Sequence, residues 1–461
     1  MSINITLIKC NKIPLLLTLV GFLFYGVFAY DLARTDYVKL ITLYTALFIL
    51  FYKLIDFGKH NLQFLTVAAF LFRVVFILAI PNLSQDFYRF LWDGRLLIQG
   101  INPYLYTPES FISVGEYPVA QAKELYTGMQ HLNASHFTNY PPVNQFCFAL
   151  AALLAGKSIA GSAMVLRLLI IAADFGTLYY GKKLLKAFNL PIHTIFWYIL
   201  NPFIIIELTG NLHFEGVMIF FLIWSLYLLH SGYWKWAAVI FALSIATKLV
   251  PLMFLPLFFW WFIKHKSKKE SNVRSGVLQL TSFYAIVIFS TLLLFVPFFS
   301  SEFITNYSKT VGLWFGKFEF NASIYYLARS IGYLFRGWNE IEIIGKVLPL
   351  LVFLFIVILA LFKRNDTTKK LITTMLFAFT FYLFTSTTVH PWYVATILAL
   401  SIFTRYKFAL VWSFIAIISY LAYANTENSE NLWVIAIEYI VVYSVFIWEV
   451  FFRVEKRLPI S

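Results

Sequence analysis

Long apolar runs separated by short polar breaks fill most of this 461-residue chain, and they limit what it can fold into. The chain is 61% apolar and only 13% charged, a composition that soluble globular domains do not have. We therefore predict an all-α polytopic membrane protein with about 13–14 transmembrane helices, since roughly 20 apolar residues cross a bilayer as a helix. The expected spans lie near residues 14–30, 37–56, 62–80, 162–181, 191–208, 216–230, 236–248, 250–263, 276–297, 342–362, 371–388, 392–403, 408–423 and 432–452.

Proline interrupts two of the apolar regions. Pro251 breaks the pair 236–248 and 250–263 near the start of its second run, and Pro391 separates 371–388 from 392–403. Proline cannot continue a helix without removing a backbone hydrogen bond. These pairs predict tight helical hairpins or broken helices whose turns lie at one membrane face. Irregular backbone at that depth is tolerated only where protein or a water-filled cavity surrounds it.

The charge distribution predicts which loops face the cytoplasm. The net charge is +14, but the basic residues are dispersed among apolar runs, so we exclude nucleic acid as a partner and apply the positive-inside rule. The segment 141–156 decides the outcome. If it is half-inserted or re-entrant, most basic residues fall in cytoplasmic loops; if it crosses, the richest basic clusters move outside. We therefore predict one membrane domain, 1–461, with large extracytoplasmic loops at 81–140 and 298–341.

The most unusual stretch is SQDFYRFLWDGRLLIQGINPY, from Ser84 to Tyr104. Asp86, Arg89 and Asp93 are spaced i, i+3 and i+7, so they share one face of a helix. The pattern predicts a short amphipathic helix lying at the membrane surface with a charged stripe. Asp86 is a candidate general base toward a hydroxyl. Alternatively it pairs with Arg89 or interacts with the helix dipole.

Three cations are candidates for binding a phosphate. Arg89 and Arg95 present guanidinium groups, which match phosphate geometry, although both could instead anchor the helix to lipid headgroups. Lys248, in ATKLVP at the tip of a predicted hairpin, is unfavourable at membrane depth unless it meets an anion. A lipid phosphate is a natural partner for it, and the alternative is that its side chain reaches up to the interface.

Two further polar segments fall on the same predicted side. Asn211, His213 and Glu215 in GNLHFEG are candidate contacts to a sugar or acceptor, or part of a solvated loop. Their His and Glu make a weak metal signal, so we predict no metal site and leave a divalent cation open. His390 in HPWY is followed by Trp392 and Tyr393, which could stack on a sugar or belong to the interfacial aromatic belt. No nucleotide-binding motif is visible.

Together these segments resemble the bacterial polyprenol-phosphate-mannose-dependent mannosyltransferases of the GT-C glycosyltransferase superfamily. QDFYRFLWDGRLLIQGINPY is close to the D-x-Y-R-Y-L-W-D-G-R…G-x-N-P-Y run of those enzymes. The resemblance covers most of the chain, but two apolar spans here precede the one that usually comes first. The later pieces follow in the same order: YPPV at Tyr140–Val143, NPFIIIELTGNLHFEG at Asn201–Gly216, ATKLVP at Ala246–Pro251, FEFNASIYYL at Phe318–Leu327 and VHPWY at Val389–Tyr393.

The resemblance implies a GT-C fold in the bacterial inner (plasma) membrane, with juxtamembrane helices and an extracytoplasmic active site in the first large loop. It implies transfer of a hexose, first of all mannose, from a polyprenyl-monophosphate donor to a glycan, lipid or protein acceptor, with inversion at the anomeric carbon. Asp86 would then be the general base, and Lys248 with Arg89 or Arg95 would bind the donor phosphate. The supporting or substrate-binding residues would be Asp93, Tyr104, Tyr140, Asn211, His213, Glu215, Asn321, His390 and Tyr393.

Two alternatives remain at this point. The donor sugar could be glucose or arabinose, with the same chemistry. The protein could also be a flippase or transporter of a lipid-linked sugar. A transporter should place charges along a path through the membrane, often at broken helices near the midplane in paired halves. Here the charged motifs gather on one predicted face and the halves do not match, which favours the enzyme.

Overall fold

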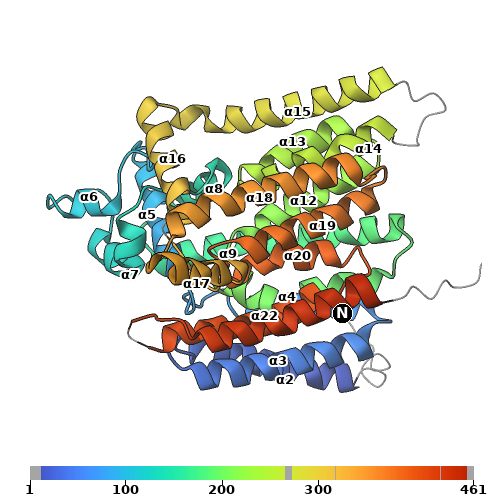
Figure 1. The fold of residues 1–461 in the computed structure, drawn as a ribbon. Coiled ribbons are helices and arrows are strands. Elements are labelled where there is room, and N and C mark those ends of the chain that lie inside the picture. The colour runs from blue at the N-terminus through green and yellow to red at the C-terminus, as the bar shows by residue number, and fades with distance from the viewer. Residues whose placement is uncertain (1–11, 265–272, 317, 426, 454–461) are drawn as a thin grey trace, which may run out of the picture.

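The computed structural model describes residues 12–264, 273–316, 318–425 and 427–453, and in these ranges the chain folds as a bundle of helices (Figure 1). This confirms the all-α prediction. Extended pairing in the described part is limited to one isolated bridge, between Phe320 and Thr388. Basic residues within 1–11, 265–272 and 454–461, which contribute to the charge argument, lie outside the described residues.

The helices follow the predicted apolar runs closely. The first half of the chain contains α2 (Lys12–Tyr30), α3 (Tyr37–Gly58), α4 (Leu62–Val74), α5 (Asp86–Ile98), α6 (Pro108–Ile112), α7 (Ala122–Ala134), α8 (Pro142–Ala155), α9 (Ile159–Ala187), η1 (Ile192–Ile195), α10 (Phe196–Ile199), α11 (Pro202–Ile204), η2 (Ile205–Gly210), α12 (Glu215–His230) and α13 (Trp234–Ile245). The second half contains η3 (Val250–Phe258), α14 (Phe259–Lys264), α15 (Val273–Phe295), η4 (Val296–Phe298), α16 (Ser301–Gly316), α17 (Ile324–Arg336), α18 (Ile341–Phe362), α19 (Thr368–Thr385), η5 (Pro391–Tyr393), α20 (Val394–Ser401), α21 (Phe408–Ile415), η6 (Ala416–Ala424), α22 (Leu432–Ile447) and η7 (Trp448–Phe452).

Six of the described helices are long and apolar enough to span a membrane, or up to seven if the bent pair 192–199 and 202–210 counts as one span. Seven shorter apolar helices accompany them. The chain is therefore a polytopic membrane protein, while the total of about 13–14 spans stays a prediction. The predicted proline breaks are confirmed, because η3 begins one residue before Pro251 and η5 begins at Pro391.

The two large predicted loops fold into short helices that gather at one end of the bundle. Figure 1 shows α5, α6, α7 and α8 beside α16 and α17 at this end, whereas α14 and α15 meet at the opposite end. The α18–α19 turn, with Lys363 and Arg364, also lies at that opposite end. Helix α8 covers the ambiguous segment 141–156, and its 14 residues measure about 21 Å along the axis, less than the hydrocarbon core. Whether it crosses stays a prediction.

Helix α5 forms where the sequence predicts a helix, but it does not lie free at a surface. It packs between α7 and α8, and nine of its 13 residues are buried. Gly94 permits this close packing, because a Cβ there would lie 2.2 Å from the Phe148 carbonyl oxygen. The predicted helix with its charged stripe is therefore present, but Arg89, Asp93 and Arg95 are buried in contacts with protein. Its position at the membrane surface stays a prediction.

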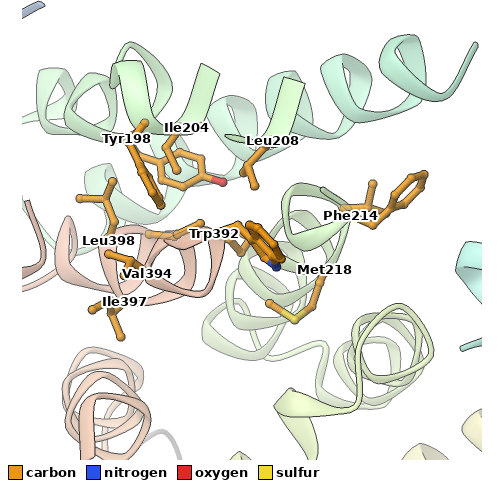
Figure 2. Packing of buried hydrophobic residues seen from close by; sticks show 14 of the residues in the cluster. Tyr198, Ile204, Leu208, Phe214, Met218, Trp392, Val394, Ile397 and Leu398 are labelled. Atoms are coloured by element: carbon orange, nitrogen blue, oxygen red, sulfur yellow. The ribbon is translucent and has the colours of Figure 1, made fainter. Parts of the chain in front are cut away.

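The apolar core lies directly beneath this end. Figure 2 shows Trp392 and Met218 close to Phe214, with side chains of α10, α11 and η2 on one side and α20 on another. These residues are buried. Burial of large apolar side chains contributes about 1.5–3 kcal/mol each. The core thus ties the HPWY segment to the start of α12, two parts of the chain that both carry predicted site residues.

Candidate active site

A cavity of about 580 Å³ opens at the end of the bundle that holds the short helices. That volume lies in the range that proteins use for small-molecule ligands. Seven of the residues singled out from the sequence line it: Asp86, Arg89, Tyr140, Glu215, Lys248, His390 and Tyr393. The other six, which are Arg95, Asp93, Tyr104, Asn211, His213 and Asn321, are not among its lining residues in the described chain.

Asp86 is the first residue of α5, and its carboxylate faces the cavity. Asn133 Nδ2 donates a hydrogen bond to Asp86 Oδ1 at 3.0 Å. Burial raises the pKa of Asp86 above the usual range of a carboxyl, and the charge of Glu215 adds to that rise. The Asn133 hydrogen bond and the charges of Lys248 and Arg34 act in the opposite direction. A carboxylate whose pKa is raised in this way is a better proton acceptor at neutral pH.

Lys248 lies in the turn between α13 and η3 and points toward the same cavity. Its Nζ lies 3.0 Å from Glu215 Oε1 and 5.6 Å from the centre of the Tyr140 ring. Two hydrogen bonds hold the turn against α8: Asn144 Nδ2 donates to the Thr247 carbonyl at 2.8 Å, and a backbone N–H of α8 donates to the Ala246 carbonyl. The lysine is therefore placed by protein contacts, as expected for an ammonium group that binds an anion.

Arg89 and Asp93 form a buried ion pair one turn along α5. Arg89 Nε donates to Asp93 Oδ1 at 2.8 Å, and Gln145 Nε2 donates to the other Asp93 oxygen at 3.1 Å. Arg89 Nη1 also donates to the carbonyls of Asn133 and His136, at 2.7 and 2.8 Å. This network holds Asn133, the residue that contacts Asp86. Asp93 thus has a structural place, and Arg89 is largely engaged in positioning.

Arg95 and Tyr104 lie behind the cavity wall. Arg95 donates to the Ala120 carbonyl at 2.6 Å and to the Lys157 carbonyl at 3.1 Å, so its guanidinium joins two loops. Tyr104 Oη donates to the Tyr140 carbonyl at 2.6 Å. These contacts do not support a phosphate contact by Arg95 or a substrate contact by Tyr104. Both brace the backbone beside the site.

Aromatic stacking organises the opposite wall. Two imidazoles stack on the Trp392 ring, with His213 at 3.8 Å and His390 at 4.5 Å between ring centres. These contacts occupy much of the indole, so stacking of Trp392 on a sugar stays a prediction. Burial, with a contribution from Lys248, lowers the pKa of both imidazoles, to about 3 for His390. Both rings are therefore neutral near pH 7.

Two amides from the predicted set also act behind the wall. Asn211 Oδ1 accepts a hydrogen bond from the Leu83 N–H at 3.1 Å and so ties η2 to the segment before α5. The Asn321 N–H donates to Glu430 Oε1 at 2.6 Å. The His213–Glu215 metal alternative finds no support, because these residues face different partners, Trp392 and Lys248. No group of three or more His, Cys, Asp or Glu that could hold a metal occurs among the described residues.

Several lining residues escape the sequence analysis. Arg34 Nη1 donates to Gln85 Oε1 at 2.9 Å, beside Asp86, and its guanidinium lies 4.1 Å from the centre of the Tyr423 ring. Glu430 lines the far wall. In sequence, Arg34 and Glu430 look like ordinary charges in short breaks between spans. Only Glu319 had a signal, since it lies within the segment FEFNASIYYL.

Comparison with known proteins finds a family match for the first half of the chain. Residues 16–264 match the sequence model of a family described as Alpha-(1->6)-mannopyranosyltransferase, N-terminal domain. The chain is also 24% identical over 225 residues to Alpha-(1->6)-mannopyranosyltransferase A of Mycobacterium tuberculosis (strain ATCC 25618 / H37Rv). That similarity covers 49% of this chain but only 40% of the relative's length. Asp86, Glu215 and Lys248 lie within the family match, whereas the wall formed after residue 310 lies beyond it.

Proposed function

This chain belongs to the Alpha-(1->6)-mannopyranosyltransferase family. We propose that it transfers a mannosyl residue from a polyprenyl-monophosphate donor to an acceptor hydroxyl. One observation carries the proposal. A carboxylate with a raised pKa, Asp86, and a lysine held by an acid, Lys248, face the same cavity at one end of a membrane bundle. A base and a cation are the two groups that transfer from a lipid phosphate requires.

In the proposed reaction Asp86 takes the proton from the acceptor hydroxyl as its oxygen bonds to the anomeric carbon. The bond between that carbon and the phosphate oxygen breaks, and the lipid phosphate leaves with the electron pair. Attack from the face opposite the phosphate inverts the anomeric centre. Lys248 stabilises the charge that develops on the leaving phosphate. Arg89 Nη2, a buried donor without a hydrogen-bond partner among the described residues, is a second candidate for the same anion.

The donor's apolar tail and its polar head both fit the position of the cavity. The lining residues come from the end of the bundle where α5 begins, and the spanning helices run directly away from it (Figure 1). We propose that this end faces the extracytoplasmic side of the plasma membrane of a bacterium, and support comes from the basic α18–α19 turn at the opposite end. The acceptor is a glycan, lipid or protein that carries a free hydroxyl.

The test uses the full-length purified protein in lipid nanodiscs. It is incubated with polyprenyl-phosphate mannose, glucose or arabinose and with a mannose oligosaccharide as acceptor, and donor consumption is followed by mass spectrometry. We expect the mannosyl donor to be consumed with formation of an extended oligosaccharide whose new linkage has the opposite anomeric configuration. Consumption of glucosyl or arabinosyl donor alone, a product of retained configuration, or movement of intact donor across the bilayer without transfer would each contradict the proposal.

A further inference from the structure

The cavity extends well beyond the reacting groups to a second wall of different character. Phe318, Glu319, Phe320, Tyr423 and Glu430 line it, and all of them come from the chain beyond the family match. Two carboxylates therefore line the same cavity as Asp86. An ionised carboxylate only accepts hydrogen bonds, so this wall suits ligand groups that donate them. It would repel a phosphate, which separates it from the Lys248 end.

Both carboxylates are held from behind by α17. Tyr325 Oη donates to Glu319, which also pairs with Arg329, and Tyr326 Oη donates to Glu430. The Glu430 pKa is raised, mainly by burial and also by the charge of Glu319. Two like charges are thus kept on one wall although they repel each other. Both oxygens of each carboxylate already accept from protein donors, with Asn339 and the Asn321 N–H completing the sets. An ionised carboxylate has about four lone-pair sites, so each can accept one further hydrogen bond from a ligand.

Aromatic rings flank the two acids. Phe320 lies between His390 and Tyr423, with ring centres 5.2 and 6.0 Å apart, and Phe318 lies 6.0 Å from His390. Apolar and aromatic walls with a few placed polar groups are typical of small-molecule sites. A pyranose ring offers C–H faces to such rings and hydroxyl donors to carboxylates. A neutral saccharide therefore fits this wall better than an anion or an alkyl chain.

The cavity shows an independent sign of a polar ligand at its other end. Arg89 Nη2 and Glu215 Oε2 are buried and have no hydrogen-bond partner among the described residues, although both residues line the cavity. Their side chains are only 4% and 5% exposed. The unmet donor of Arg89 suits the phosphate of the proposed donor, and the unmet acceptor of Glu215 suits a hydroxyl group. Leaving them unsatisfied is unfavourable, so a ligand that carries both a phosphate and hydroxyl groups would stabilise the site.

We propose that Glu319 and Glu430, with Phe318 and Phe320, form the subsite that binds a sugar ring of a saccharide acceptor. Hydroxyls of that ring donate to the two carboxylates, and the ring packs against Phe318, the less buried of the two phenylalanines, so that another hydroxyl points to Asp86. This inference rests on the proposed mannosyl transfer, and it names the residues that would recognise a saccharide acceptor. It assigns acceptor recognition to the part of the chain beyond residue 264.

The experiment compares the variants Glu319→Gln and Glu430→Gln with wild type, and varies donor and acceptor concentrations separately. We expect the acceptor KM to rise roughly 10-fold to 100-fold for each, the loss of one hydrogen bond to a charged group. The donor KM and the slow hydrolysis of donor by water should stay within about 2-fold, because the two carboxylates are assigned to the acceptor and not to the donor phosphate. Glu342→Gln, on the exposed surface of α18, is the matched control.

Two readouts guard against misfolding. Donor hydrolysis by water reports an intact reaction centre in each variant, and Glu319→Asp, which keeps the charge, should recover part of the acceptor affinity. An unchanged acceptor KM in both Gln variants would overturn the subsite, and so would an equal rise in the donor KM. Failure of the proposed function itself looks different, because wild type would then consume no mannosyl donor at any acceptor concentration.

Discussion

The two walls of the cavity differ in chemistry and in their place in the chain. One wall holds Asp86 and Lys248, within the range that matches the family, and combines a carboxylate with a cation. The other holds Glu319 and Glu430, beyond that range, and combines acids with aromatic rings. On our proposals the first wall breaks and forms bonds while the second selects the acceptor. The comparison teaches that a family match to half of a chain can describe the reaction centre without describing the acceptor.

The largest effect on the first wall is expected from Asp86→Asn. This variant keeps the size of the side chain but cannot accept the acceptor proton, so kcat for mannosyl transfer should fall about 10²-fold to 10⁴-fold, the usual contribution of a general base. Donor binding, measured by titration with polyprenyl-phosphate mannose, should persist. Asp31→Asn is the control, because Asp31 forms an exposed ion pair with Lys39 at 2.8 Å. Transfer at the wild-type rate by Asp86→Asn would remove the base from the first wall.

A second acid on the same helix should behave in the opposite way. Asp93 is buried, pairs with Arg89 and accepts from Gln145. Asp93→Asn leaves the Arg89 charge without its counter-ion, which in buried pairs lowers stability by about 3–5 kcal/mol. We expect a clearly lower midpoint in thermal unfolding of the nanodisc protein, whereas Asp86→Asn should unfold near the wild-type temperature. Equal midpoints for the two variants would show that α5 does not divide into a reacting residue and a supporting pair.

The contrast between Asp86 and Asp93 also marks how far the sequence could predict the site. Both acids stood out because charge is rare in this chain, and the helix itself was correctly placed. Which acid faces a cavity depends on α7 and α8, whose packing a periodic pattern does not specify. Arg95 stood out for the same reason as Arg89, yet its guanidinium only joins two loops.

Residues that act through distant partners were beyond the sequence analysis. Asn133 contacts Asp86 although the two residues are 47 positions apart in sequence. It lies on α7, a largely polar helix that no apolar run in the sequence predicts. Glu430 is fixed by Tyr326 and by the Asn321 N–H, more than 100 positions earlier. The bundle, in contrast, was predictable, because membrane spans follow from local hydropathy alone. Lys248, which does line the cavity, stood out because a lysine at membrane depth is unfavourable without an anionic partner. The buried charges Asp93 and Arg95 stood out in the same way and lie outside the cavity lining, so this signal does not by itself identify a site residue.

Lys248→Met tests the cation of the first wall. Removing one preorganised charge from a developing oxyanion lowers kcat/KM by about 10²-fold, and the donor should bear most of that loss. The effect should be measured with donor concentration varied at saturating acceptor. Lys346→Met is the control, since Lys346 pairs with Glu342 on an exposed face. A normal donor response in Lys248→Met, together with loss of acceptor binding, would reverse the roles of the two walls.

The smallest expected effect concerns the acid limb of the pH profile of kcat/KM. Asp86 must be ionised to act as a base, so activity should rise with pH through a midpoint above the usual carboxyl range, because burial raises the pKa of Asp86. Lys248 lowers that pKa and Glu215 raises it. The midpoint should therefore move to higher pH in Lys248→Met and to lower pH in Glu215→Gln, each by up to about one unit. Glu342→Gln should leave it in place. If the acid-limb midpoint in all three variants equalled that of wild type, the titrating base would not be the Asp86 carboxylate.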